Sequence, residues 1–209
     1  MNKTRTFSPA LFTLLLTAAG VLLLTSCKET EEVEEFGNWQ ERNEAFIDSI
    51  ARVCDANADG RWAKYLSFKL NDKDVKGNEV HWDNQYYVYC HSEVKGTGTV
   101  SPLFTDTVAC NYRGHLIPTT TYPEGYVFDQ SYKGNAINPE VNVPTSLPVG
   151  SLTVGFCTML HYMHIGDTWR VYVPAELGYG AQVQDASGIP AYSTLVFDVN
   201  LADIRHTRN

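Results

Sequence analysis

Residues 163–180 read MHIGDTWRVYVPAELGYG, and they contain a helix stop signal followed by a strand. Gly166 is a stop signal because glycine readily adopts the left-handed conformation in which many helices end. Trp169, Val171 and Val173 then occupy alternate positions, as in a strand with one buried face. The stretch therefore predicts a helix before Gly166 and a strand of an antiparallel sheet directly after it.

The sequence on either side of this stretch extends the same pattern. Residues 152–163 have the apolar spacing of one helix, carried by Leu152, Phe156, Met159, Leu160 and Met163. Aromatic and β-branched runs at 86–90, 107–112 and 194–201 have the character of strands. A single short helix against an antiparallel sheet is an α+β arrangement in which the helix covers the apolar face.

Five blocks follow one another in the C-terminal half. They are VACNYRG at 108–114, GYVFDQS at 125–131, MHIGDTWR at 163–170, VPAELGYG at 173–180 and GIPAYSTLVFDV at 188–199. In order and spacing, this half resembles the FKBP-type peptidyl-prolyl isomerases, immunophilins that bind FK506, over residues 86–205. The resemblance implies an FKBP-like antiparallel sheet of five or six strands wrapped around the one short helix, with an aromatic pocket between them.

The resemblance also implies roles for individual residues. Those that match the family's catalytic pocket are Tyr112, Phe128, Asp129, Phe156, Tyr179 and Phe197. Those that match substrate-binding positions are Leu152, Thr153, Ile189 and Tyr192. In the family pattern the Thr153 backbone N–H meets the ligand, and the Tyr179 hydroxyl bonds a substrate carbonyl. Ile189 would lie on a flap loop.

Several positions depart from the family pattern. Phe156 stands where Trp is common, Thr153 stands where Ile is usual, and the flap has Ala191 after Ile189-Pro190. An insertion at 119–123 enlarges the turn before Phe128, and residues 138–147 are too divergent to place the remaining pocket phenylalanine. We expect isomerase activity to survive these changes, with altered affinity for FK506-like drugs and an altered preference for the substrate sequence.

An aromatic pocket suits isomerisation of an X-Pro bond, whose barrier of about 18–20 kcal/mol comes from amide resonance. The twisted amide loses its charge separation, so an apolar pocket favours it without a nucleophile, metal or cofactor. We predict a peptidyl-prolyl cis-trans isomerase that assists the folding of exported proteins. The alternative is a catalytically weak FKBP-like module that binds proteins or acts as a chaperone on the cell envelope.

Each residue also has an interpretation that involves no catalysis. Aromatic residues that alternate along strands are usually core, and Asp129 alone is compatible with a turn cap. Cys157 with His161 and His164 suggests a Cys-His nucleophile, but no third orienting group is evident. The joint placement of the pocket residues is what favours the isomerase.

The N-terminus has the features of an exported lipoprotein. Lys3 and Arg5 precede an uncharged run over 10–24 that is short for a membrane span, and Leu-Thr-Ser at 24–26 precedes Cys27. These residues resemble the leader and lipidation box of bacterial lipoproteins. We expect a signal peptide over 1–26, lipid on Cys27, and attachment to the outer membrane, at its periplasmic face or on the cell surface.

An acidic tether is predicted at 27–37, because KETEEVEE at 28–35 is highly charged and cannot build a core. The whole chain has a formal net charge of −8, and loss of Lys3 and Arg5 with the leader makes the remainder more acidic. We therefore expect no nucleic-acid partner. The expected partners are proline-containing unfolded or extended polypeptides, FK506-like or rapamycin-like ligands, and the membrane through the lipid.

Residues 38–85 are predicted to form an N-terminal helical segment and connecting loop before the isomerase domain at 86–209. Trp39 to Cys54 has the apolar spacing of an amphipathic helix. Such a helix either pairs with a second copy to make a homodimer or packs on its own domain, and we favour the second. Residues 66–85 are polar and predict a loop with at most one short strand.

Residues 55–60, DANADG, begin like a calcium-binding loop. The twelfth position, which should be a bidentate Glu, is Leu66, so we expect a helix-ending turn and no metal. The cysteines of the folded part have wide spacings that suit either disulfides or buried thiols. They are Cys54, Cys90, Cys110 and Cys157.

Overall fold

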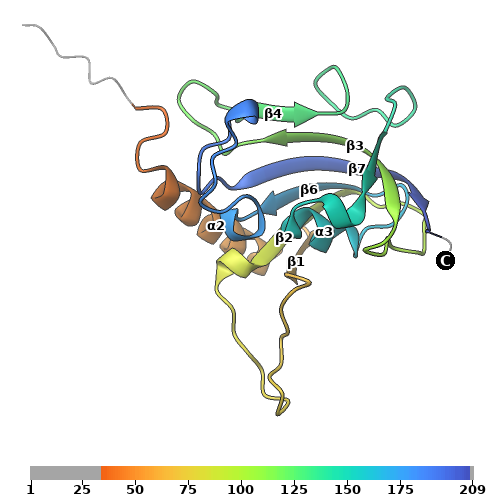
Figure 1. The fold of residues 1–209 in the computed structure, drawn as a ribbon, viewed down its shortest axis with the longest axis horizontal. Helices are drawn as coiled ribbons and strands as arrows, with labels where there is room; N and C mark the ends of the chain where they lie inside the picture. Colours follow the sequence, from red (N-terminus) through yellow and green to blue (C-terminus); the bar gives the residue numbers. More distant parts are fainter. Residues whose placement is uncertain (1–33, 208–209) are drawn as a thin grey trace, which may run out of the picture. The chain divides into compact units, whose positions relative to one another are not determined.

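A seven-stranded antiparallel sheet organises residues 35–207 in the computed structural model, which describes residues 34–207 (Figure 1). The predicted signal peptide over 1–26, Cys27 and most of the predicted tether lie outside the described residues. The strands are β1 (Trp62–Leu66), β2 (Tyr87–Val94), β3 (Thr107–His115), β4 (Val127–Gln130), β5 (Thr145–Pro148), β6 (Thr168–Val173) and β7 (Leu195–Arg205). Their order is β1-β2-β6-β7-β3-β4, and β5 pairs with β3.

The predicted α+β class and the predicted strands are confirmed, but the sheet is larger than the expected five or six strands. The additional strand is β1, which pairs with β2 from Trp62 opposite His91 to Leu66 opposite Tyr87. The strand thus ends at Leu66, and the expected connecting loop follows it. The loop carries only an isolated bridge between Lys73 and Glu79 and a turn of 3-10 helix at Asn84–Tyr86.

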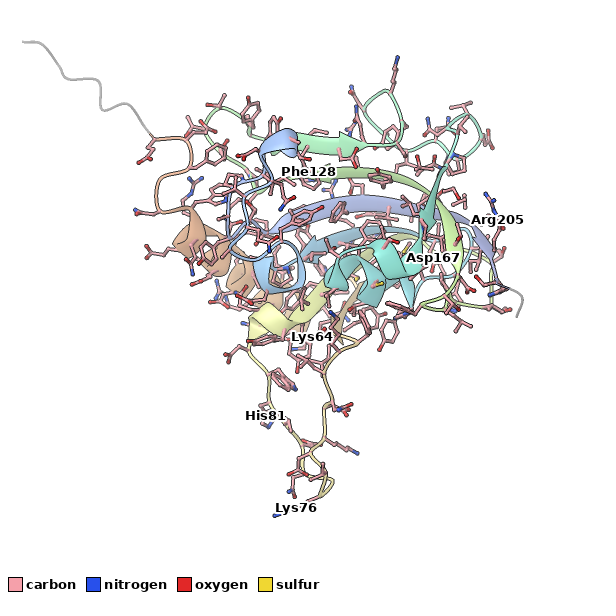
Figure 2. The ribbon with its side chains drawn as sticks, viewed as in Figure 1. Lys64, Lys76, His81, Phe128, Asp167 and Arg205 are labelled. Carbon is pink, nitrogen blue, oxygen red and sulfur yellow. The ribbon has the colours of Figure 1, made fainter. Side chains whose placement is uncertain are left out.

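This connecting loop projects from the sheet, with Lys76 near its tip and His81 on the returning limb (Figure 2). Its tip is closed by the Asp74 carboxylate, which accepts hydrogen bonds from the backbone N–H groups of Lys76 and Asn78 at 2.8 and 2.9 Å. Such local bonds give a polar segment a defined turn without a core.

The short helix α3 (Val154–Leu160) covers one face of the sheet. It is shorter than the predicted 152–163, because the chain after Leu160 continues in three-residue turns, from Tyr162 N–H to Met159 O and from Met163 N–H to Leu160 O. Met163 is nevertheless fully buried in the same core. Of the five residues with this apolar spacing, four are buried and Leu152 is partly buried, so the spacing identified the core face while overestimating the helix length.

The N-terminal helix α2 (Trp39–Ala56) packs on its own domain, on the other side of β2. Tyr89 of β2 joins a buried cluster with Ile47, Ala51 and Cys54, whereas its neighbours Val88 and Cys90 belong to the core under α3. This division follows from the alternation of side chains along a strand. The helix and the loop after it lie in the same compact unit as the sheet, and the predicted boundary at residue 85 stays a prediction.

The predicted helix-ending turn after α2 is confirmed. Asn57 adopts the left-handed conformation (φ 40°), and its side-chain oxygen accepts the Trp62 N–H at 2.9 Å. Asp55 pairs with Lys64, and Asp59 with Arg61. Within residues 34–207, no cluster of three or more acidic, His or Cys side chains has an arrangement suited to a metal ion.

The four cysteines of the described fold are free thiols, and all of them are buried. Between residues 34 and 207, none of the helices combines the length and the apolar character needed to cross a membrane.

Candidate active site

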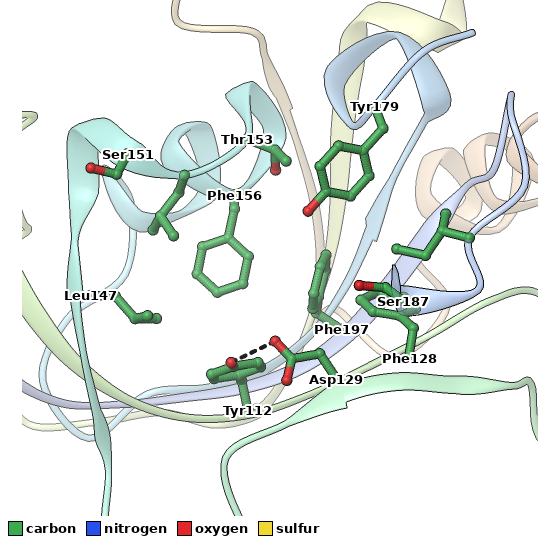
Figure 3. A pocket seen from close by; sticks show the side chains of 12 residues that line it. Tyr112, Phe128, Asp129, Leu147, Ser151, Thr153, Phe156, Tyr179, Ser187 and Phe197 are labelled. Carbon is green, nitrogen blue, oxygen red and sulfur yellow. Dashed lines mark hydrogen bonds between the residues drawn. The ribbon is translucent and has the colours of Figure 1, made fainter. Parts of the chain in front are cut away.

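A cavity of about 380 Å³ opens between α3, the curved sheet and the loops before β7 (Figure 3). All of the pocket residues expected from the sequence line it except Tyr192. The complete lining consists of Tyr112, Phe128, Asp129, Leu147, Ser151, Leu152, Thr153, Phe156, Tyr179, Ser187, Ile189 and Phe197.

Four aromatic rings form the floor and walls. Phe156, on α3, lies edge-on to Phe197 of β7 and to Tyr112 of β3, with ring centroids 5.0 and 6.4 Å apart. Phe128 of β4 lies edge-on to Phe197 at 5.6 Å. Each edge-to-face pair contributes about 0.5–1.5 kcal/mol beyond its buried area, so the rings fix one another's orientation.

Asp129 is the one carboxylate among the lining residues. It lies beside Phe128 on β4, and one of its oxygens accepts a hydrogen bond from the Tyr112 hydroxyl at 2.7 Å (Figure 3). Burial, and then this bond, raise the pKa of the Tyr112 phenol, so the hydroxyl remains a proton donor at neutral pH. The carboxylate itself stays exposed at the mouth of the cavity.

Hydroxyl groups line the rim opposite Asp129. Tyr179 follows a turn of 3-10 helix at Ala175–Leu177, and its hydroxyl points into the cavity (Figure 3). Thr153 precedes α3 in an extended conformation and makes no side-chain capping bond. Its hydroxyl oxygen is buried without a hydrogen-bond partner among the described residues.

The sequence did not identify three lining residues, namely Leu147, Ser151 and Ser187. Leu147 belongs to the stretch 138–147 that matched no family block, and it reaches the cavity because β5 pairs with β3, opposite Val108. Ser151 and Ser187 lie in short 3-10 turns. Only the long-range strand pairing and the folded loops bring these residues to the pocket.

Tyr192 lies away from the cavity lining. It adopts a left-handed conformation (φ 60°), and its backbone N–H donates to the Gly180 carbonyl at 2.7 Å. Tyr192 therefore belongs to the loop that carries Ile189 and is not one of the residues that line the cavity.

The arrangement of Cys157 does not favour a Cys-His nucleophile. Its thiol is buried and donates to the Val149 carbonyl at 2.8 Å, and burial raises its pKa, which disfavours the reactive thiolate. His161 instead lies edge-on to Phe68, with ring centroids 5.6 Å apart.

Residues 98–202 match the family described as FKBP-type peptidyl-prolyl cis-trans isomerase. The chain belongs to this family. The FKBP-type domain is 36% identical over 110 residues to the FKBP-type 22 kDa peptidyl-prolyl cis-trans isomerase of Escherichia coli, covering 53% of this chain and 46% of that protein. It is 33% identical over 110 residues to the outer membrane protein MIP of Legionella longbeachae, covering 53% and 41%. The chain thus spans about half the length of these relatives.

The FKBP-type fold also has a counterpart among solved structures. The peptidyl-prolyl cis-trans isomerase of Pseudomonas syringae pv. tomato superposes with a TM-score of 0.54 over 82% of this chain and 96% of that one. At 21% identity, this likeness shows a shared fold.

Proposed function

We propose that this protein is a peptidyl-prolyl cis-trans isomerase that acts on proline-containing segments of unfolded or extended polypeptides. The observation that carries the proposal is that Phe156, the other aromatic walls and Asp129 surround one open cavity in a chain of the FKBP family. In the sequence these residues span 86 positions, from Tyr112 to Phe197, counting both ends.

The cavity suits the chemistry because it is apolar where the amide turns. A planar X-Pro amide carries partial charges that water stabilises, and these decrease as the C–N bond twists. A wall of aromatic rings stabilises the twisted form relative to the planar form and thereby lowers the barrier. The nearly buried rings of Phe156 and Phe197 provide this surface.

The polar rim would hold the peptide on both sides of the turning bond. We assign substrate hydrogen bonds to the Tyr179 hydroxyl and to the Thr153 backbone N–H. Asp129 would orient the Tyr112 hydroxyl and polarise the twisting carbonyl through neighbouring donors. Leu152 and Ile189 would contact the flanking side chains. FK506-like ligands would enter the same cavity.

The test is the cis-to-trans relaxation rate of a short Ala-Leu-Pro-Phe peptide in the presence of purified residues 28–209, which contain the whole described unit. We expect acceleration proportional to protein concentration. Asp129→Ala should reduce kcat/KM about 10- to 100-fold, the equivalent of a hydrogen bond to a charged group. Asp203→Ala, which removes an exposed carboxylate from β7, is the matched control and should retain full activity.

Absence of acceleration by folded wild-type protein would contradict the proposal and favour the binding or chaperone module. Loss of activity in both variants would show that the effect of Asp129→Ala is not specific to the pocket.

We further propose that the protein is exported and anchored to the outer membrane through lipid on Cys27. The charged start, the apolar run over 10–24 and the Leu-Thr-Ser-Cys box support this, as does the name of the Legionella relative, an outer membrane protein. Cys27→Ser should abolish incorporation of labelled palmitate in cells and release the protein from the membrane fraction. Unchanged labelling would overturn the proposed anchor.

Because α2 buries Ile47, Ala51 and Cys54 against its own sheet, we propose that this helix serves its own domain rather than a homodimer. Sedimentation of residues 28–209 should give a monomer, and a stable dimer would contradict this.

A further inference from the structure

The loop that carries the pocket residue Ile189 is held by backbone hydrogen bonds of its own, by a bond from Tyr192 to Gly180, and by contacts with α2. We define this flap loop as residues 184–194, from the turn at Asp185–Ser187 to the start of β7. A reciprocal pair of backbone bonds joins Gln184 and Ile189, at 2.9 and 3.2 Å. Tyr192 holds a left-handed conformation that is unfavourable for a side chain of its size. Contacts from outside the loop must therefore stabilise this shape.

The first of these contacts comes from Trp39 at the start of α2. Its indole N–H donates to the Ser193 hydroxyl at 2.8 Å, across 154 positions of sequence. The Ser193 hydroxyl in turn donates to the Pro190 carbonyl at 2.7 Å. These two hydrogen bonds form a relay from Trp39 through Ser193 to Pro190. Pro190 directly follows Ile189, so the chain of bonds ends next to the residue that lines the cavity.

The second contact comes from Asn43, one turn further along α2. Its side-chain oxygen accepts the Thr194 N–H at 2.7 Å, and its side-chain N–H donates to the Trp39 carbonyl, also at 2.7 Å. Asn43 and Thr194 are 2% and 1% exposed. Because water cannot replace these bonds, loss of either partner leaves a buried polar group unsatisfied.

The segment before α2 fixes the Trp39 ring. Phe36 lies edge-on to Trp39, with centroids 4.9 Å apart, and the Arg42 guanidinium lies 5.1 Å from the indole centre. Arg42 also donates to the Glu35 carbonyl at 3.0 Å. The indole N–H is thus held in the direction of Ser193.

We propose that Trp39 and Asn43 are positioning residues of the isomerase pocket, through which α2 holds the flap loop so that Ile189 remains a wall of the cavity. This role rests on the proposed function. Under this proposal, the N-terminal helix α2 helps to support the pocket, although α2 lies outside the residues that match the family (98–202).

Three variants test the relay. Trp39→Phe keeps the aromatic ring and removes the donor, Ser193→Ala removes the acceptor, and the double variant carries both changes. Ile47→Val is the matched control, because Ile47 packs α2 on Tyr89 in a cluster that contains no residue of the flap loop. Amide hydrogen exchange of the flap loop is measured beside kcat/KM and the melting temperature of each protein.

We expect each single variant to speed exchange of the Ile189, Tyr192 and Thr194 amides, and to lower kcat/KM, by about fivefold, the equivalent of one net hydrogen bond. The double variant should lose no more than Ser193→Ala alone, because both changes break the same relay. Ile47→Val should lower the melting temperature while leaving flap exchange and kcat/KM unchanged.

Flap exchange that is unchanged in Trp39→Phe, or equally fast in Ile47→Val, would overturn the proposal. Additive losses in the double variant would also overturn it. Because hydrogen exchange does not depend on turnover, an inactive wild-type protein would refute the proposed function, and the exchange rates would still decide whether α2 holds the flap loop.

Discussion

Gly114 on β3 lies directly against two aromatic walls of the pocket, Phe128 and Phe197. A Cβ atom there would lie 2.5 Å from the Phe128 ring and 2.7 Å from the Phe197 ring, well inside van der Waals contact. The rings can approach the strand this closely only because glycine has no side chain. Residue 114 therefore lets both rings pack against the strand although it does not itself line the cavity.

Gly114→Ala should accordingly lower the free energy of unfolding by about 1–3 kcal/mol, the usual cost of overpacking. It should also move Phe128 and Phe197 and weaken ligand binding in the pocket. Urea unfolding and titration with a proline peptide would measure the two effects. Wild-type stability together with wild-type affinity would contradict this account of Gly114.

His91 on β2 is the residue through which pH should act on stability. Its ring nitrogens lie 2.7 Å from Asp59 and 2.7 Å from Glu93, and Arg61 contacts both carboxylates. Burial opposes protonation, but the hydrogen bonds to Asp59 and Glu93 outweigh it and raise the pKa of His91 above 6.5. The bond to His91 is the main reason that the pKa of Asp59 falls to about 2.

The two shifts define a pH window. The contribution of His91 is complete below its unfolded pKa of 6.5 and is lost as the pH rises through the raised value. The contribution of Asp59 is present above 3.8 and is lost as the pH falls toward 2. Wild type should exceed His91→Gln in stability by more at about pH 5.5 than at about pH 8.5. Urea unfolding of both proteins at the two pH values is the measurement. A stability difference between wild type and His91→Gln that is equal at both pH values would refute the prediction.

At the scale of elements, α2 and the sheet should unfold as one unit. Ile47 is completely buried at their contact, whereas Val53 on the same helix is 48% exposed. Ile47→Ala should cost about 2–5 kcal/mol, and Val53→Ala should change stability by less than about 0.5 kcal/mol.

Helix content and Trp fluorescence would follow this unfolding. Their transitions should coincide in wild type and in both variants. A separate early transition in helix content would show that α2 melts independently, and this would also weaken its proposed role at the flap loop.

At the scale of the whole molecule, the buried thiols predict stability without disulfides. Burial raises the pKa of all four, to about 12 for Cys110, which keeps them protonated and unreactive in the folded protein. For residues 28–209, dithiothreitol should leave the melting temperature unchanged, and a thiol reagent should react only as fast as the protein unfolds. A lower melting temperature in reductant would indicate a disulfide.

Much of this molecule could be predicted from its sequence, because the deciding patterns are local. The alternation of Trp169, Val171 and Val173, the spacing from Phe156 to Met163 and the left-handed turn at Asn57 each depend on residues a few positions apart. The resemblance to the family then identified nine of the twelve residues that line the cavity.

Contacts between distant segments were decided only by the tertiary structure. β1 belongs to the sheet because it pairs with the otherwise free edge of β2. Leu147 lines the pocket because β5 pairs with β3. Asn43 and Thr194 are 151 positions apart, and neither belongs to a pattern that indicates the other. Periodicity reports which face of an element is buried, whereas the partner of a buried polar group depends on how the whole chain packs.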